Sequence, residues 1–137
     1  MNLKDKVIKL TREAELKQTH QGALDEVLVA LRRSFSHRSG KWAFKVAPCV
    51  PLHMSVVIVS NTMMIIFDKN NDEMTIEKVQ IYLRSEDLVF KDASNAGERY
   101  LSVSAAELAM PGIIRSLAMN VFNLDQDLHW CLCAGKF

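Results

Sequence analysis

The chain is poor in the residues that build nucleotide-binding loops and disulfide frameworks. It contains 5 glycines, 3 prolines and 3 cysteines among 137 residues. With so few glycines, the chain is a poor candidate for a glycine-rich loop that binds phosphate through its backbone N–H groups. No glycine-framed serine and no HExxH metalloprotease motif occurs either. The usual hydrolase and nucleotide-binding fingerprints are therefore absent, which argues against an enzyme and predicts no cofactor.

The chain also lacks long apolar runs and a cleavable leader. No stretch approaches the ~18 apolar residues that span a bilayer. The first ten residues have neither an uninterrupted apolar core nor a small-residue cleavage site. An odd number of cysteines, in a chain that is 49% hydrophobic, fits a reducing compartment better than a disulfide framework. We therefore expect a cytoplasmic protein without membrane contact.

Length and charge predict one folded domain over residues 1–137. The chain is long enough to bury a core, and its 24% charged residues and net charge of +1 are unlike those of disordered proteins. The charge is uneven, because residues 1–50 carry ten Lys or Arg and five acids, whereas residues 51–137 carry seven and eleven. Such a dipolar protein can associate with itself head to tail.

Period-two hydrophobic runs dominate the middle of the chain. Residues 54–60, 62–67 and 74–83 read as consecutive antiparallel strands, since their short polar connections allow only hairpins. The first two runs are almost continuously apolar, which places them at the centre of a sheet. Shorter runs predict three more strands, at residues 41–47, 88–90 and 128–133.

Helical spacing appears on both sides of this block. Leu3, Val7, Leu10 and Ala14 form one apolar stripe, and residues 24–35 form a second after a break or kink at residues 19–22. A capping-box pattern at Ser104 opens a late helix, which either kinks at Pro111 or starts there. The fold class is therefore α+β, with an N-terminal helical segment and a late helix packed on one mostly antiparallel sheet of five or six strands.

Five residues are candidates for a metal site: Cys49, His53, His129, Cys131 and Cys133. The last three share one face if residues 128–133 are a strand. Sulfur and imidazole ligands suit zinc, but the spacing is not that of a structural zinc knuckle. The competing interpretation is that the cysteines are small core residues. Cys49 and His53 would also be the residues of an enzymatic site, although nothing in the sequence orients that histidine.

A basic segment at residues 32–45 is the candidate nucleic-acid site, with Arg32, Arg33, Arg38, Lys41 and Lys45. Trp42 and Phe44 are interleaved with these cations, and aromatic rings can stack on bases. If both rings share a strand face with Val46, however, they point away from the lysines into the core. A solvated helix end and strand edge is then the simpler explanation.

Seven methionines, four of them within residues 54–74, suggest either core filling or an adaptable binding surface. A sheet that is apolar on both faces must also hide its second face, through self-association, a partner or a ligand. The leading hypothesis is a small non-catalytic protein-binding protein, of accessory, inhibitor or immunity type, that acts as a homodimer. Nucleic-acid binding through residues 32–45 is the first alternative, and a small-molecule or enzymatic pocket between helix and sheet is the second.

Overall fold

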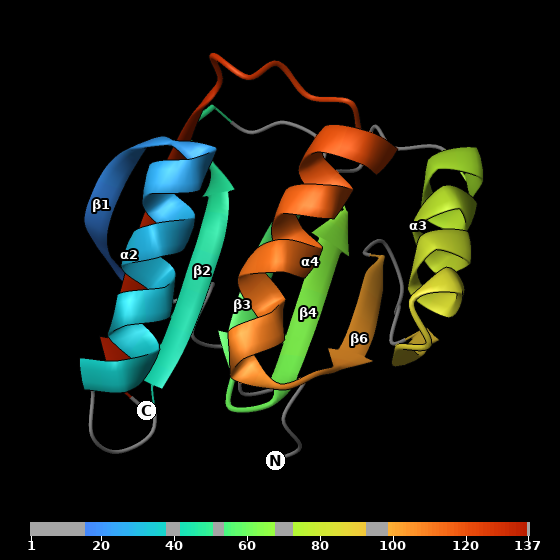
Figure 1. The fold of residues 1–137 in the computed structure, drawn as a ribbon, viewed down its shortest axis with the longest axis horizontal. Helices are drawn as coiled ribbons and strands as arrows, with labels where there is room; N and C mark the ends of the chain where they lie inside the picture. The colour runs from blue at the N-terminus through green and yellow to red at the C-terminus, as the bar shows by residue number, and fades with distance from the viewer. Residues whose placement is uncertain (1–15, 38–41, 51–53, 68–72, 93–98, 137) are drawn as a thin grey trace.

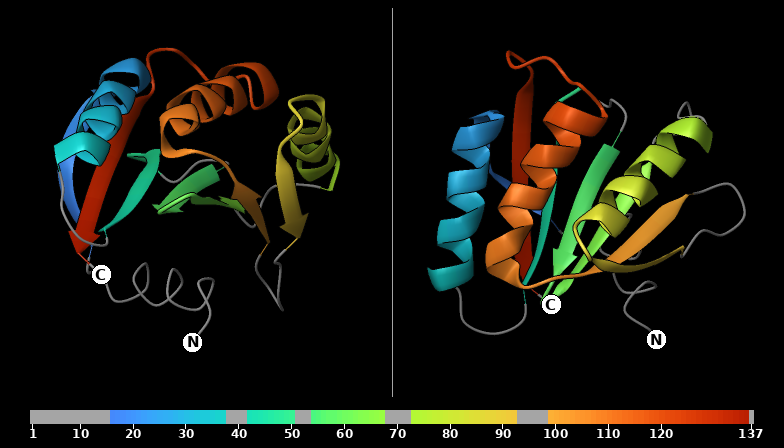
Figure 2. Two further views of the ribbon diagram at one scale, coloured as in Figure 1. Left: turned by 60° about the horizontal axis from the view of Figure 1, so that its bottom comes forward. Right: turned by 45° about the vertical axis from the view of Figure 1, so that its right-hand side comes forward.

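The computed structural model describes residues 16–37, 42–50, 54–67, 73–92 and 99–136. They form one antiparallel sheet with the helices on one of its faces (Figures 1 and 2). The sheet has seven strands in the order β1-β7-β2-β3-β4-β6-β5. Their bounds are β1 (Lys17–Ala23), β2 (Trp42–Pro48), β3 (Met54–Val59), β4 (Thr62–Phe67), β5 (Val89–Asp92), β6 (Tyr100–Ser104) and β7 (His129–Lys136).

Three α-helices cover the sheet: α2 (Leu24–His37), α3 (Glu73–Ser85) and α4 (Met110–Ser116). A 3-10 turn, η1 (Glu107–Ala109), precedes α4, and a π-helical turn, η2 (Leu117–Val121), continues it. Figure 1 shows α4 over the middle of the sheet, α2 beside it over the end formed by β1, β7 and β2, and α3 at the opposite end. In the part of the chain that the structure describes, every helix is too short or too polar to span a bilayer. The predicted α+β class is confirmed, with seven strands rather than five or six.

The central hairpin and four further elements lie where the sequence predicts them. β3 and β4 are joined by a tight turn, in which Ser60 has a φ of 54°, and their side chains are nearly all buried. The apolar stripe of residues 24–35 forms α2. The runs predicted as strands at residues 41–47, 88–90 and 128–133 correspond to β2, β5 and the start of β7. The predicted helix over Leu3 to Ala14 lies outside the described residues.

Three predicted elements are wrong. Residues 74–83 form α3 rather than a strand, because Ile76, Val79 and Leu83 are spaced by three and four residues and bury one side of a helix. Residues 19–22 are not a helix break but part of β1, which pairs with β7. Ser104 ends β6 and caps no helix, so the predicted capping box is wrong. The alternative that the late helix starts at Pro111 is confirmed, because α4 begins at Met110 and has Pro111 in its first turn.

The sheet separates two buried clusters. The main core lies between the sheet and the helices, and its largest side chains with under 2% exposure include Trp130, Leu31 and Ile114. The far-face cluster lies on the opposite face and consists of Ala43, Val57, Val59, Met64 and Tyr100. Both faces of the sheet are therefore removed from water, as the nearly continuous apolar runs of β3 and β4 predict.

Candidate protein-interaction surface

Helix α3 has two apolar sides. Ile76, Val79 and Leu83 point into the main core, and α3 packs against β5 and η2. Met74 and Ile81 lie on the other side, with exposed fractions of 66% and 56%. A single exposed apolar residue is ordinary. Here two of them, seven positions apart, lie in the same row of one helix.

The exposed row of α3 has two charged residues between two apolar ones. Residues seven apart lie nearly one above the other on a helix, so Met74 and Ile81 mark its two ends. Glu77 and Lys78 lie between them, and both are exposed. We define these four residues as the α3 outer row. It combines two exposed apolar side chains with two opposite charges.

Ion pairs and a cation–π contact fix α3 to its neighbours. Arg99, which precedes β6, donates hydrogen bonds to Glu73 at the start of α3 and to Asp92 at the end of β5, the latter 3.4 Å long between Nη2 and Oδ2. At the other end of the helix, the Arg84 guanidinium lies 5.5 Å from the ring centroid of Phe90. These contacts hold the outer row in a defined orientation.

The three predicted basic residues that the structure describes do not share one surface. Arg32 and Arg33 are exposed on α2, on the helix side of the sheet. Lys45 lies on the opposite face, because Phe44 and Val46 beside it point into the main core. Arg38 and Lys41 are outside the described residues. Trp42 packs against the main core, so the stacking ring that the nucleic-acid hypothesis requires is turned away from Lys45.

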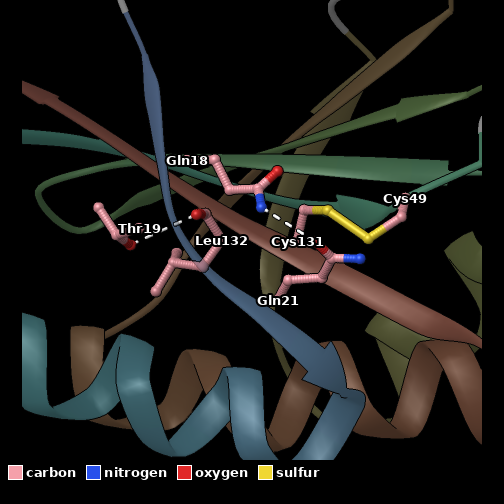
Figure 3. Close-up of a disulfide and its surroundings, with 6 residues drawn as sticks. All are labelled: Gln18, Thr19, Gln21, Cys49, Cys131 and Leu132. Carbon is pink, nitrogen blue, oxygen red and sulfur yellow. Dashed lines mark hydrogen bonds between the residues drawn. A yellow bond between two sulfur atoms is a disulfide. The ribbon is translucent and has the colours of Figure 1, made fainter.

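The structure joins two of the predicted metal ligands in a disulfide. Cys49 follows β2 and Cys131 is in β7, and their Cα atoms lie 5.5 Å apart (Figure 3). The backbone N–H of Cys49 also donates to the carbonyl of His129, 2.9 Å away. The expectation that the cysteines stay unpaired is wrong for this pair, because the adjacent antiparallel strands bring them within bonding distance.

Of the other three predicted ligands, His129 and Cys133 share one face of β7 with Cys131, as the sequence predicts. His53 lies outside the described residues, His129 is exposed and Cys133 is half-buried. Within the described ranges, no three His, Cys, Asp or Glu side chains gather in a way that could hold a metal ion. The disulfide occupies two of the five predicted ligands. A metal site at these residues therefore stays a prediction only for the protein in which Cys49 and Cys131 are reduced.

Cys133 is the free thiol among the described cysteines. Burial raises its pKa, while the positive charge of Lys45 on the neighbouring strand lowers it; burial is the larger effect. The thiolate is the reactive form, so a raised pKa keeps this thiol protonated and unreactive at neutral pH.

We therefore expect slow alkylation of Cys133 by iodoacetamide at pH 7 in the native protein, accelerating as the pH becomes alkaline. Mass spectrometry of the modified peptide measures the rate. Lys45→Met removes the charge that favours the thiolate and should slow the reaction further. Denatured protein provides the reference rate, and native labelling as fast as that reference at pH 7 would contradict the assignment.

A hollow of about 200 Å³ lies beside the start of α2, lined by Ala23, Leu24, Asp25, Arg115, Met119 and Gln126. Its two charged groups already bind each other, with 2.9 Å between Arg115 Nε and Asp25 Oδ1. Both side chains are more than half exposed. The hollow therefore offers a ligand no buried polar group, and it lies between helices rather than between helix and sheet.

No family model, no curated protein and no solved structure matches this chain. The sequence does not predict the α3 outer row, because residues 74–83 are expected to form a strand, in which Val79, Ile81 and Leu83 would share one face. The signal that identifies the helix is the spacing of Ile76, Val79 and Leu83, which leaves Ile81 on the opposite side.

Proposed function

We propose that this protein is a small non-catalytic binding protein, of accessory, inhibitor or immunity type, that acts as a homodimer through the α3 outer row. The supporting observation is the exposure of Met74 and Ile81 on a helix whose other side is already buried. The far-face cluster is a weaker candidate for the interface, because its five residues are at most 4% exposed.

The outer row is complementary to itself. In an antiparallel pair of helices related by a two-fold axis between residues 77 and 78, Met74 meets Ile81 of the partner subunit. In the same arrangement Glu77 meets Lys78 of the partner subunit, so apolar residues contact apolar residues and each acid contacts a base. In a two-fold interface the same patch of each subunit meets, so the patch must be complementary to itself. The four residues are all exposed, so no rearrangement of the core is needed.

A charge-swap series tests this pairing. Glu77→Lys places two lysines opposite the two lysines of the partner subunit, so we expect the dimer to weaken by about tenfold, the equivalent of 1.4 kcal/mol. Glu77→Lys combined with Lys78→Glu restores opposite charges and should restore the dimer. Sedimentation equilibrium measures both dissociation constants. If the double variant is as weak as the single one, the proposed register is wrong.

A further inference from the structure

The face of the sheet opposite the helices carries four metal-ligating side chains at its β7 end. The even-numbered residues of β7 from 130 to 134 are buried in the main core. His129, Cys131 and Cys133 alternate with them and therefore point to the opposite face. Cys49 reaches the same face, because its sulfur is bonded to that of Cys131.

The backbone places Cys49 level with His129. Cys49 directly follows β2, and its N–H donates to the carbonyl oxygen of His129, 2.9 Å away. This hydrogen bond continues the ladder in which Ala47 pairs with Cys131, so Cys49 and His129 are cross-strand neighbours. The Cβ atoms of such neighbours lie about 4.5–5.5 Å apart. The Cα atoms of Cys49 and Cys131 are also only 5.5 Å apart. Two sulfurs and one imidazole therefore project from adjacent positions.

Cys133 lies too far along β7 to join these three side chains. It is four residues beyond His129, a distance of ~13 Å along a strand. It also pairs with Lys45 on β2, whose positive charge acts on the Cys133 thiol and would repel a bound cation. The candidate ligand set is therefore Cys49, His129 and Cys131.

These three positions are accessible from solvent. His129 is exposed, and Cys49 and Cys131 are half-buried. On the β1 side the disulfide is flanked by Gln18 and Gln21, whose side-chain amides bond to each other and add no charge (Figure 3). A thiol reductant and a cation can therefore both reach the two sulfurs.

Reduction of the disulfide converts its two sulfurs into metal ligands. In the oxidised protein they are bonded to each other, and no three side chains of the described ranges gather for a metal ion. Two molecules of a thiol such as glutathione break the S–S bond and leave two cysteine thiols and one glutathione disulfide. A zinc ion then replaces both thiol protons, which pass to water, and forms two Zn–S bonds and one bond to the imidazole.

We propose that Cys49, His129 and Cys131 form a zinc site that exists only in the reduced protein. Three protein ligands leave one tetrahedral position for a water molecule. The disulfide and the metal exclude each other, because both use the same two sulfurs. The proposal is independent of the α3 outer row, which lies at the opposite end of the sheet.

Zinc titration of the reduced full-length chain tests this site. Protein in a phosphine reductant competes for zinc with a chromophoric chelator, and we expect one zinc ion to bind per chain. Cys131→Ser and His129→Ala should each weaken binding by more than about 100-fold, since even the outer-shell partners of metal ligands contribute about 10- to 100-fold. Cys133→Ser removes a thiol from the same face and is the matched control, which should bind zinc like the wild type.

Three outcomes of the titration would overturn the proposal: no binding by the reduced wild type, unchanged affinity in His129→Ala, or equal losses in Cys133→Ser and Cys131→Ser. His129 is exposed, and serine is close to cysteine in size, so these variants should keep the fold. Circular dichroism of each variant checks that they do.

Cobalt(II) provides a second measurement, because thiolate ligation produces a charge-transfer band and tetrahedral coordination produces strong visible bands. Both should appear with the reduced wild type. Added glutathione disulfide should abolish them, since it accepts the electrons of the two thiolates and becomes two glutathione thiols while the Cys49–Cys131 bond re-forms. Cobalt bands that persist after intact mass shows the disulfide to be complete would also overturn the proposal.

Discussion

Replacing Ile81 by glutamate should convert the protein from a dimer into a monomer. The side chain is 56% exposed in the single chain, and in the proposed pairing it is buried against Met74 of the partner subunit. A carboxylate in that position loses its hydration and gains no partner, which costs several kcal/mol. We therefore expect the dissociation constant to rise by about 100-fold or more, since each 1.4 kcal/mol is a factor of ten. Sedimentation equilibrium over a range of protein concentrations measures it.

The matched control for this experiment is Val29→Glu. Val29 is an apolar residue on a helix with a similar exposed fraction, 52%, but it belongs to α2. Glutamate is a good helix former, so neither substitution should disturb its helix. The proposed interface requires that Val29→Glu leave the dimer intact. A wild-type protein that sediments as a monomer at every concentration, or two variants that weaken the dimer equally, would count against the α3 outer row.

Breaking the Cys49–Cys131 disulfide should remove up to about 4 kcal/mol from the free energy of unfolding. The two residues are 82 positions apart in the sequence, so the crosslink restricts most of the unfolded chain. Urea denaturation of the wild type and of Cys49→Ser under oxidising conditions measures the difference. Adding reductant should destabilise the wild type by the same amount and leave Cys49→Ser unchanged.

Cys133→Ser is the control for this prediction, because its thiol is unpaired in the structure. It should keep its response to reductant. An independent measurement is the intact mass of the wild-type protein after alkylation in denaturant without reductant. One modified cysteine, Cys133, is expected. Three modified cysteines would mean that the pair is reduced in the purified protein. Disulfides persist in oxidising compartments, so this measurement also tests the expectation of a cytoplasmic protein.

The sequence predicts the elements whose burial pattern allows one interpretation. β3 and β4 are nearly continuous apolar runs joined by two turn residues, and no helix fits so short a repeat. α3 is ambiguous, because Val79, Ile81 and Leu83 alternate like a strand while Ile76, Val79 and Leu83 follow a helix. The structure resolves the ambiguity through tertiary contact with β5 and η2, which a local pattern does not contain.

β1 is an element that the sequence pattern does not predict at all. Its sequence is polar and all but one of its residues are exposed, so neither propensity nor periodicity marks it as a strand. It exists because β7 offers it an open hydrogen-bonding edge. The candidate interaction surface was unpredictable for a related reason: an exposed apolar residue is informative only once the fold shows which side of its element is already buried.

The position of β7 affects how the chain can fold as it is synthesised. β7 lies between β1 and β2, although eighty residues, 49–128, separate it from β2 in the sequence. Until residues 129–136 leave the ribosome, β1 has no strand to pair with and β2 has an open edge. Pairings between such distant segments slow folding and prolong the exposure of apolar strands. The exposed strands of the incomplete sheet are therefore open to aggregation for as long as β7 is missing.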